Sequence, residues 1–172
     1  MEAVPSLGHS PAARLSPDWH LRMTAQPGPI RLAVIDSDSG FVRVFLKRAE
    51  GVGWEYRALT APPPTDDLLA MRLNAVVVDL AILGPRAWEF LERLCGSMPG
   101  LGVVVCTGQS TVAQRVRGLR LGADDWITKP CHPEEVVARV EAVVRRRKRA
   151  GTRVDAGPVS YTHLTLPTIY SV

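Results

Sequence analysis

Short apolar runs alternate with stretches of helical apolar period along the chain from Ile30 onward. The apolar runs predict strands at residues 31–35, 54–59, 75–78, 103–106 and 126–128. After each run, apolar residues recur every three to four positions, which predicts a helix. These helices are expected over residues 41–51, 65–73, 88–94, 112–119 and 133–144. The chain therefore repeats a strand–helix unit five times.

The predicted helices carry capping residues at their starts. Thr65 or Asp66 is expected to cap the second helix, and Ser110 or Thr111 the fourth. His132 and Pro133 stand where a cap and a first helical residue belong. The strands are apolar throughout rather than alternating, which is typical of strands covered on both faces. The pattern predicts an α/β fold with a parallel sheet and helices on each side.

Polar side chains follow four of the predicted strands. They are Asp36, Asp79, Thr107 and Lys129. The carboxyl ends of parallel strands meet at one edge of a sheet, so we expect these side chains to converge. Two close carboxylates suit Mg²⁺, and an ammonium and a hydroxyl beside them suit a phosphoryl group. One carboxylate is then a candidate nucleophile that forms an aspartyl phosphate.

Four segments carry a resemblance to a known family. They are Leu32-Ala-Val-Ile-Asp-Ser-Asp38, Ala75-Val-Val-Val-Asp-Leu80, Val105-Cys-Thr107 and Gly122-Ala-Asp-Asp-Trp-Ile-Thr-Lys-Pro130. Together they resemble the receiver domain of two-component response regulators, over residues 30–149. The stretches Arg115-Val-Arg-Gly-Leu119 and Glu135-Val-Val-Ala-Arg-Val140 are similar to the winged-helix, OmpR-type subfamily. The resemblance implies a doubly wound, five-stranded parallel sheet with the flavodoxin-like order 2-1-3-4-5.

The resemblance also implies a role for each residue at the sheet edge. Asp79 is expected to accept a phosphoryl group from a sensor histidine kinase. Asp36, Asp79 and the Ala81 carbonyl would hold Mg²⁺, Lys129 would pair with one phosphoryl oxygen, and Thr107 would bond another. These roles are those of a signalling switch in a phosphorelay and not of a turnover enzyme. We expect the protein to lie in the cytoplasm and to regulate transcription.

Some positions depart from the family pattern. The family has two adjacent acids after its first strand, whereas here Ser37 follows Asp36 and the second acid is Asp38. We expect the lost carboxylate to weaken Mg²⁺ binding and to slow phosphoryl transfer. Leu83 stands where a proline is common, and Trp126 stands at the position of a switch aromatic that is usually Tyr or Phe.

Two alternatives follow from these departures. One is a pseudo-receiver that acts as a protein-interaction module without phosphorylation. The other is a phosphatase of the haloacid dehalogenase type, with Asp36 as nucleophile and Asp38 as acid/base. That family places its terminal acid pair after the lysine, whereas Asp124 and Asp125 precede Lys129 here.

By resemblance, phosphorylation favours a symmetric homodimer through a charged face. Pairs are expected between Arg115 and Glu135, between Asp125 and Arg139, and between Asp124 and Arg146. Arg120 and Glu141 have signs exchanged relative to the family, which would disfavour dimers with relatives. Contact with DNA is expected only through a further domain, which we take to be missing.

Composition and charge add little to this prediction of fold and function. The 172 residues are 46% hydrophobic and 22% charged, as in ordinary globular proteins, and no membrane span or signal-peptide core is evident. The net charge of +4 depends on the basic run from Arg145 to Arg149, without which it is −1. Cys95, Cys106 and Cys131 have no metal-ligand spacing, and we expect reduced, mostly buried thiols.

Both ends of the chain differ from the middle. Residues 1–29 contain five prolines and no apolar period, which predicts disorder, and Met23 is a candidate start. Residues 150–158 are expected to be a linker. Residues 159–172 begin with Val159-Ser-Tyr-Thr-His-Leu-Thr-Leu-Pro-Thr168, which resembles a translated sequencing adapter. We expect this tail to be non-native and the effector domain to be truncated.

Overall fold

A five-stranded parallel sheet forms the centre of the computed structural model, which describes residues 28–153. Its strands are β1 (Arg31–Ile35), β2 (Glu55–Leu59), β3 (Ala75–Val78), β4 (Gly102–Thr107) and β5 (Asp125–Thr128). Their order across the sheet is β2-β1-β3-β4-β5, and every neighbouring pair is parallel. The expected doubly wound fold and strand order are confirmed.

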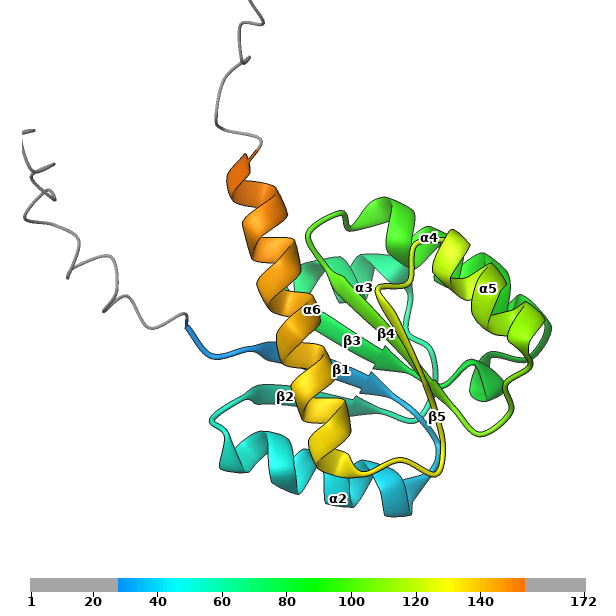
Figure 1. Ribbon diagram of the computed structural model, residues 1–172, viewed down its shortest axis with the longest axis horizontal. Coiled ribbons are helices and arrows are strands. Elements are labelled where there is room, and N and C mark those ends of the chain that lie inside the picture. Colours follow the sequence, from blue (N-terminus) through cyan, green and yellow to red (C-terminus); the bar gives the residue numbers. More distant parts are fainter. Residues whose placement is uncertain (1–27, 154–172) are drawn as a thin grey trace, which may run out of the picture.

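Helices cover both faces of this sheet (Figure 1). The α-helices are α2 (Ser39–Gly51), α3 (Thr65–Ala70), α4 (Ala87–Ser97), α5 (Val112–Arg120) and α6 (Pro133–Arg153), and a 3₁₀ helix, η1 (Leu80–Arg86), precedes α4. Helices α2 and α6 lie on one face, and α3, α4 and α5 lie on the other.

Alternate residues of each central strand supply two separate cores. In β1, Leu32 and Val34 pack with the α2–α6 core, whereas Ala33 and Ile35 pack with the core on the α3–α4 side. All four residues of β3 and all six of β4 are buried. Edge strand β2 differs, because four of its five residues are exposed. The prediction that the strands are covered on both faces therefore holds for the interior of the sheet and not for this edge strand.

Several helix boundaries differ from the prediction. Helix α3 begins after Pro64, with no side-chain cap, so neither Thr65 nor Asp66 acts as its cap. The helix ends at Ala70 rather than Leu73, because Arg72 adopts a positive φ of 49°. Helix α6 continues four residues beyond 149, into the expected linker.

Two other helix starts agree with the sequence. Thr111 caps α5 in a capping box with Gln114, whose backbone N–H lies 3.2 Å from Thr111 Oγ1. His132 Nδ1 accepts a hydrogen bond from the Glu134 N–H, and α6 begins at Pro133. Asp38 caps α2.

The expectations for the chain ends lie outside the described residues, apart from residues 28 and 29 and the first residues of the expected linker. They are the disordered segment of residues 1–29, the candidate start at Met23 and the adapter-derived tail. Within residues 28–153, every helix is too short or too polar to cross a bilayer.

Candidate functional site

The four predicted polar residues meet at the carboxyl edge of the sheet. Asp36 follows β1, Asp79 follows β3, Thr107 ends β4 and Lys129 follows β5. Asp36, Asp79 and Thr107 are 2%, 7% and 2% exposed. Three polar side chains buried side by side are costly unless they are hydrogen-bonded or react with a ligand, so this edge is the candidate site.

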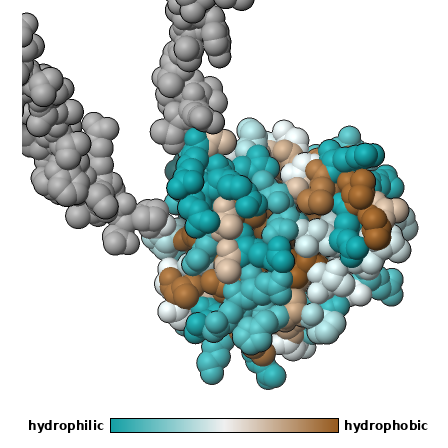
Figure 2. All heavy atoms as spheres, viewed as in Figure 1, coloured by the Kyte–Doolittle hydropathy of each residue, from teal (hydrophilic) through white to brown (hydrophobic). Residues whose placement is uncertain are grey.

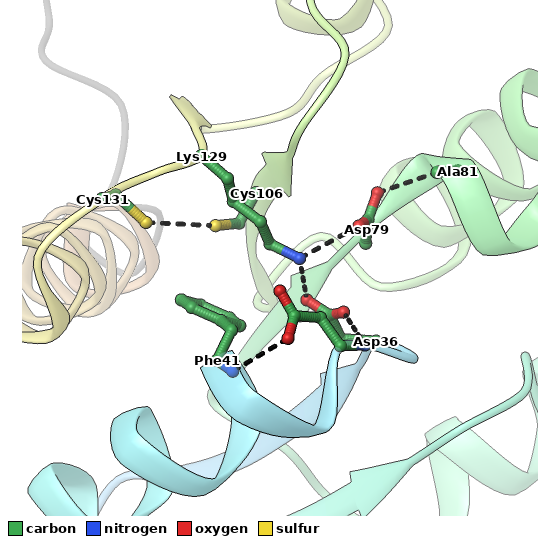
Figure 3. A network of polar contacts seen from close by, with 8 residues as sticks. Asp36, Phe41, Asp79, Ala81, Cys106, Lys129 and Cys131 are labelled. Atoms are coloured by element: carbon green, nitrogen blue, oxygen red, sulfur yellow. Dashed lines mark hydrogen bonds and ion pairs between the residues drawn. The ribbon is translucent and has the colours of Figure 1, made fainter.

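Lys129 joins the two carboxylates (Figure 3). Its Nζ lies 2.6 Å from Asp36 Oδ2 and 3.0 Å from Asp79 Oδ2. Burial alone lowers the pKa of Lys129, but the hydrogen bonds from its ammonium to Asp36 and Asp79 outweigh burial and raise the pKa above its ordinary value. The ammonium is therefore charged at neutral pH and neutralises part of the charge on the acid pair.

Backbone N–H groups hold the other oxygen of each carboxylate. Asp79 caps η1, because its Oδ1 accepts from the Ala81 N–H at 2.9 Å. Asp36 Oδ1 accepts from the Asp38 N–H at 2.8 Å. Each carboxylate is thus fixed in orientation by its own loop, with one oxygen directed at Lys129.

The loop after β1 supplies one acid to this site rather than two. Asp38 Oδ1 accepts from the Phe41 N–H at 3.0 Å, so this carboxylate caps α2. Ser37 is exposed. Among the described residues there is no group of three or more His, Cys, Asp or Glu side chains that could hold a metal ion.

Two neighbours of the site were not identified from the sequence. The Lys129 ammonium lies 4.7 Å from the centroid of the Phe41 ring, a cation–π contact. The Sγ atoms of Cys106 and Cys131 lie 3.7 Å apart. The sequence predicted Phe41 only as the first residue of a helix. The two cysteines are 25 positions apart, so the sequence did not indicate their contact.

Trp126 is buried on the other side of the site and is held by three groups. Its Nε1 donates to Ser110 Oγ at 2.9 Å, and its ring stacks on Trp88 with centroids 6.4 Å apart. Gly118 packs directly against its ring. A cavity of about 150 Å³ lies between Trp126, Trp88 and Thr107.

The residues predicted for a dimer face lie on α5, β5 and α6, and several are paired within the monomer. Arg139 contacts Asp125 at 3.0 Å and Glu135 at 2.8 Å. Asp124 pairs at 2.9 Å with Arg147, whereas Arg146 reaches only the backbone carbonyl of Asp124.

The remaining predicted members of this face are Arg115, which donates to Ser110 Oγ at 3.4 Å, and Arg120 and Glu141, which are exposed. Three apolar side chains on α5 are also exposed: Val112 by 67%, Val116 by 40% and Leu119 by 47%. Figure 2 shows brown atoms over this helix. The helical spacing of these three residues predicted α5, and the same residues form an apolar stripe that faces solvent.

Comparison with known proteins agrees with this geometry. The family model for the response regulator receiver domain matches residues 58–141. "Response regulator MprA" of Mycobacterium sp. (strain KMS) is 33% identical over 147 residues, which are 82% of this chain and 61% of that relative. "Probable transcriptional regulatory protein TcrX" of Mycobacterium tuberculosis is 31% identical over 132 residues, 75% of this chain and 55% of the relative. The chain belongs to the response regulator receiver family.

Solved receiver structures have the same fold. A CheY-like receiver domain from Methanospirillum hungatei matches with a TM-score of 0.63 at 21% identity, covering 72% of this chain and 99% of that one. DrrB, an OmpR/PhoB homologue from Thermotoga maritima, matches with a TM-score of 0.58 at 24% identity, covering 69% of this chain and 54% of that one.

The family match does not include the first part of the domain. The family match begins at Ala58, after β1 and the acid loop that carries Asp36. The chain spans 55% to 61% of the length of these two curated relatives. The family match itself runs from β2 into α6.

Proposed function

We propose that Asp79 accepts a phosphoryl group from a sensor histidine kinase and that the domain acts as a phosphorelay switch. The observation that carries this proposal is the Asp79 carboxylate, 7% exposed at the sheet edge, with the Lys129 ammonium 3.0 Å from its Oδ2. A phosphoryl acceptor needs a carboxylate nucleophile and a cation that neutralises the transferred group.

The transfer assigns one task to each residue. A carboxylate oxygen of Asp79 attacks phosphorus, the bond between phosphorus and the donor histidine nitrogen breaks, and the nitrogen keeps the electron pair. Lys129 then exchanges its contact with the carboxylate for one with a phosphoryl oxygen. The Thr107 hydroxyl, buried at the end of β4, donates to another phosphoryl oxygen.

The donor set fits Mg²⁺ held by two carboxylates and several waters. The carboxylates of Asp36 and Asp79 would be its side-chain ligands, and the backbone carbonyl of Ala81 would be a third ligand. Mg²⁺ prefers oxygen donors of this kind. When bound, the ion neutralises charge on the phosphoryl oxygens. Because Ser37 replaces an acid, we propose weaker binding than in a receiver with two adjacent acids.

Phosphorylation by acetyl phosphate in Mg²⁺ tests the proposal. Intact-mass spectrometry should show one phosphoryl adduct on the wild type, formed faster after Ser37→Asp and lost after Asp79→Asn. Asp79→Asn keeps the size of the side chain and removes its nucleophilicity, so it is the matched control. No adduct in the wild type or in Ser37→Asp would instead favour a phosphorylation-independent interaction module.

The partners that we propose follow from the surface and the relatives. Phosphorylation should favour a homodimer through α5, β5 and α6, which present the stripe of Val112, Val116 and Leu119 beside mixed charges. TcrX is named as a probable transcriptional regulatory protein. Regulation of transcription is the output that we propose, through a DNA-binding part outside residues 28–153.

A further inference from the structure

Two thiols face each other directly behind the phosphoryl-acceptor site. Cys106 Sγ and Cys131 Sγ are 3.7 Å apart and point toward one another in Figure 3. Cys106 is the residue before Thr107 in β4, and Cys131 lies two residues after Lys129 in the loop before α6. The pair therefore connects the two chain segments that carry the hydroxyl and the ammonium of the site.

The surroundings of the pair favour reaction of the two thiols with each other. A disulfide bond is about 2.0 Å long, so the sulfurs need to approach by less than ~2 Å. Both residues pack in the α2–α6 core. Cys95 packs in the core on the opposite face of the sheet, so it cannot compete in the folded protein.

We propose that Cys106 and Cys131 are a redox-active pair, and that a small-molecule disulfide oxidises them to an internal disulfide that fixes the Lys129 loop against β4. Cys131 reacts first, because it is partly exposed whereas Cys106 is fully buried. The Cys131 thiolate attacks one sulfur of the small disulfide and releases one small thiol.

The second step closes the bond within the protein. Cys106 loses its proton and attacks Cys131 Sγ, which releases the second small thiol. Two protein thiols are oxidised and one small disulfide is reduced to two thiols, so electrons and protons balance. Burial, the largest cause, raises the pKa of both thiols, so each is mainly neutral at pH 7 and the exchange is slow at low oxidant concentration.

The proposal is tested with the purified chain and oxidised glutathione. Without reductant, the intact mass should fall by two hydrogen atoms, and a reducing agent should restore it. Persistent glutathione on Cys131, or unreacted protein, would overturn the proposal. Since this readout needs no phosphorylation, its failure is separate from any failure of the proposed phosphoryl transfer.

Variants assign the bond to these two cysteines. Trypsin leaves Cys95 and Cys106 in one peptide, Leu94 to Arg115, so the mapping uses Cys95→Ser, which should still lose two hydrogen atoms. The expected cross-link joins that peptide to Leu121–Arg139, because trypsin does not cut between Lys129 and Pro130. Cys131→Ser, at a partly exposed position, should abolish the loss, and Cys106→Ala provides a second variant if Cys131→Ser folds poorly.

Hydrogen exchange tests the consequence for the loop. Amides in a peptide that covers residues 129–132 should exchange more slowly in the oxidised than in the reduced wild type. In Cys131→Ser the oxidant should leave exchange unchanged. Equal exchange in the two wild-type forms, in a sample whose mass shows the disulfide, would overturn the claim that the bond fixes the Lys129 loop.

Discussion

Lys129 is the residue on which the charge balance of the site depends. Its ammonium contacts Asp36 and Asp79, and its side chain is only 12% exposed. Two buried carboxylates that face each other without a cation repel, and solvent screens them weakly. The lysine is therefore a structural requirement of the resting site as well as a phosphoryl ligand in the proposed reaction.

Lys129→Met is expected to destabilise the fold by about 3 kcal/mol at pH 7, because it leaves two buried carboxylates uncompensated. Urea unfolding measures the difference. Lys47→Met, at an exposed position on α2, is the matched control and should change the free energy of unfolding by less than about 0.5 kcal/mol. Equal effects of the two substitutions would show that the ammonium does not balance the acid pair.

The pH dependence of this stabilisation follows from the raised pKa of Lys129. A folded pKa above the unfolded value of 10.5 means that the stabilisation is complete below about pH 10.5. It is lost as pH rises through the higher folded pKa. The difference in free energy of unfolding between wild type and Lys129→Met should therefore stay constant from pH 8 to 10 and shrink at higher pH.

Helix α5 rests on strand β5 through a glycine contact. A Cβ built at Gly118 would lie 2.8 Å from Cε3 of Trp126, closer than non-bonded carbon atoms approach. The indole cannot retreat easily, because it is hydrogen-bonded to Ser110 and stacked on Trp88. The absence of a side chain at residue 118 therefore sets how closely this helix approaches the sheet.

Gly118→Ala is expected to cost about 1–3 kcal/mol through overpacking, although alanine favours helix by about 1 kcal/mol. Gly96→Ala is the matched control, since Gly96 lies in α4 with open space around its Cα. That substitution should leave stability unchanged or raise it. Thermal unfolding of both variants checks the contrast, and a stabilising Gly118→Ala would mean that the helix shifts freely.

The sequence predicted the positions of the site residues better than the direction in which each helix face points. Strand ends placed Asp36, Asp79, Thr107 and Lys129 correctly, because apolar runs end where strands end and parallel strands share an edge. Periodicity cannot tell whether an apolar stripe faces the core or solvent, so the exposure of Val116 was not predictable.

Side-chain partners were less predictable still. The conformation of the loop after β1 decides whether the Asp38 carboxylate lies at the site or caps α2. The spacing of residues along the sequence does not determine that conformation. The contact between Cys106 and Cys131 likewise depends on the path of the chain after β5.

At the scale of the whole molecule, the face formed by α5, β5 and α6 combines exposed apolar side chains with charges that are already paired internally. Arg139 is held by Asp125 and Glu135 in the monomer. Exposed pairs contribute only about 0.2–1 kcal/mol each, so the apolar stripe must supply much of the affinity of the proposed dimer.

We expect weak self-association that strengthens on phosphorylation. Arg139→Glu should weaken the dimer by placing like charges together, and adding Asp125→Arg should partly restore it. Val116→Ser should weaken association without changing charge. Sedimentation at low salt, with and without acetyl phosphate, measures each case. A monomer at high protein concentration in every state would contradict the dimer.

The stacked indoles of Trp88 and Trp126 also give the domain an intrinsic optical reporter. Both rings border the small cavity that Thr107 lines, and the Arg117 guanidinium lies 4.4 Å from the centroid of the Trp88 ring. Trp54 is buried in the core on the other face of the sheet and provides an internal reference. Any rearrangement around Thr107 should therefore alter the emission and near-ultraviolet dichroism of this indole pair, so the proposed switch can be followed without an attached label.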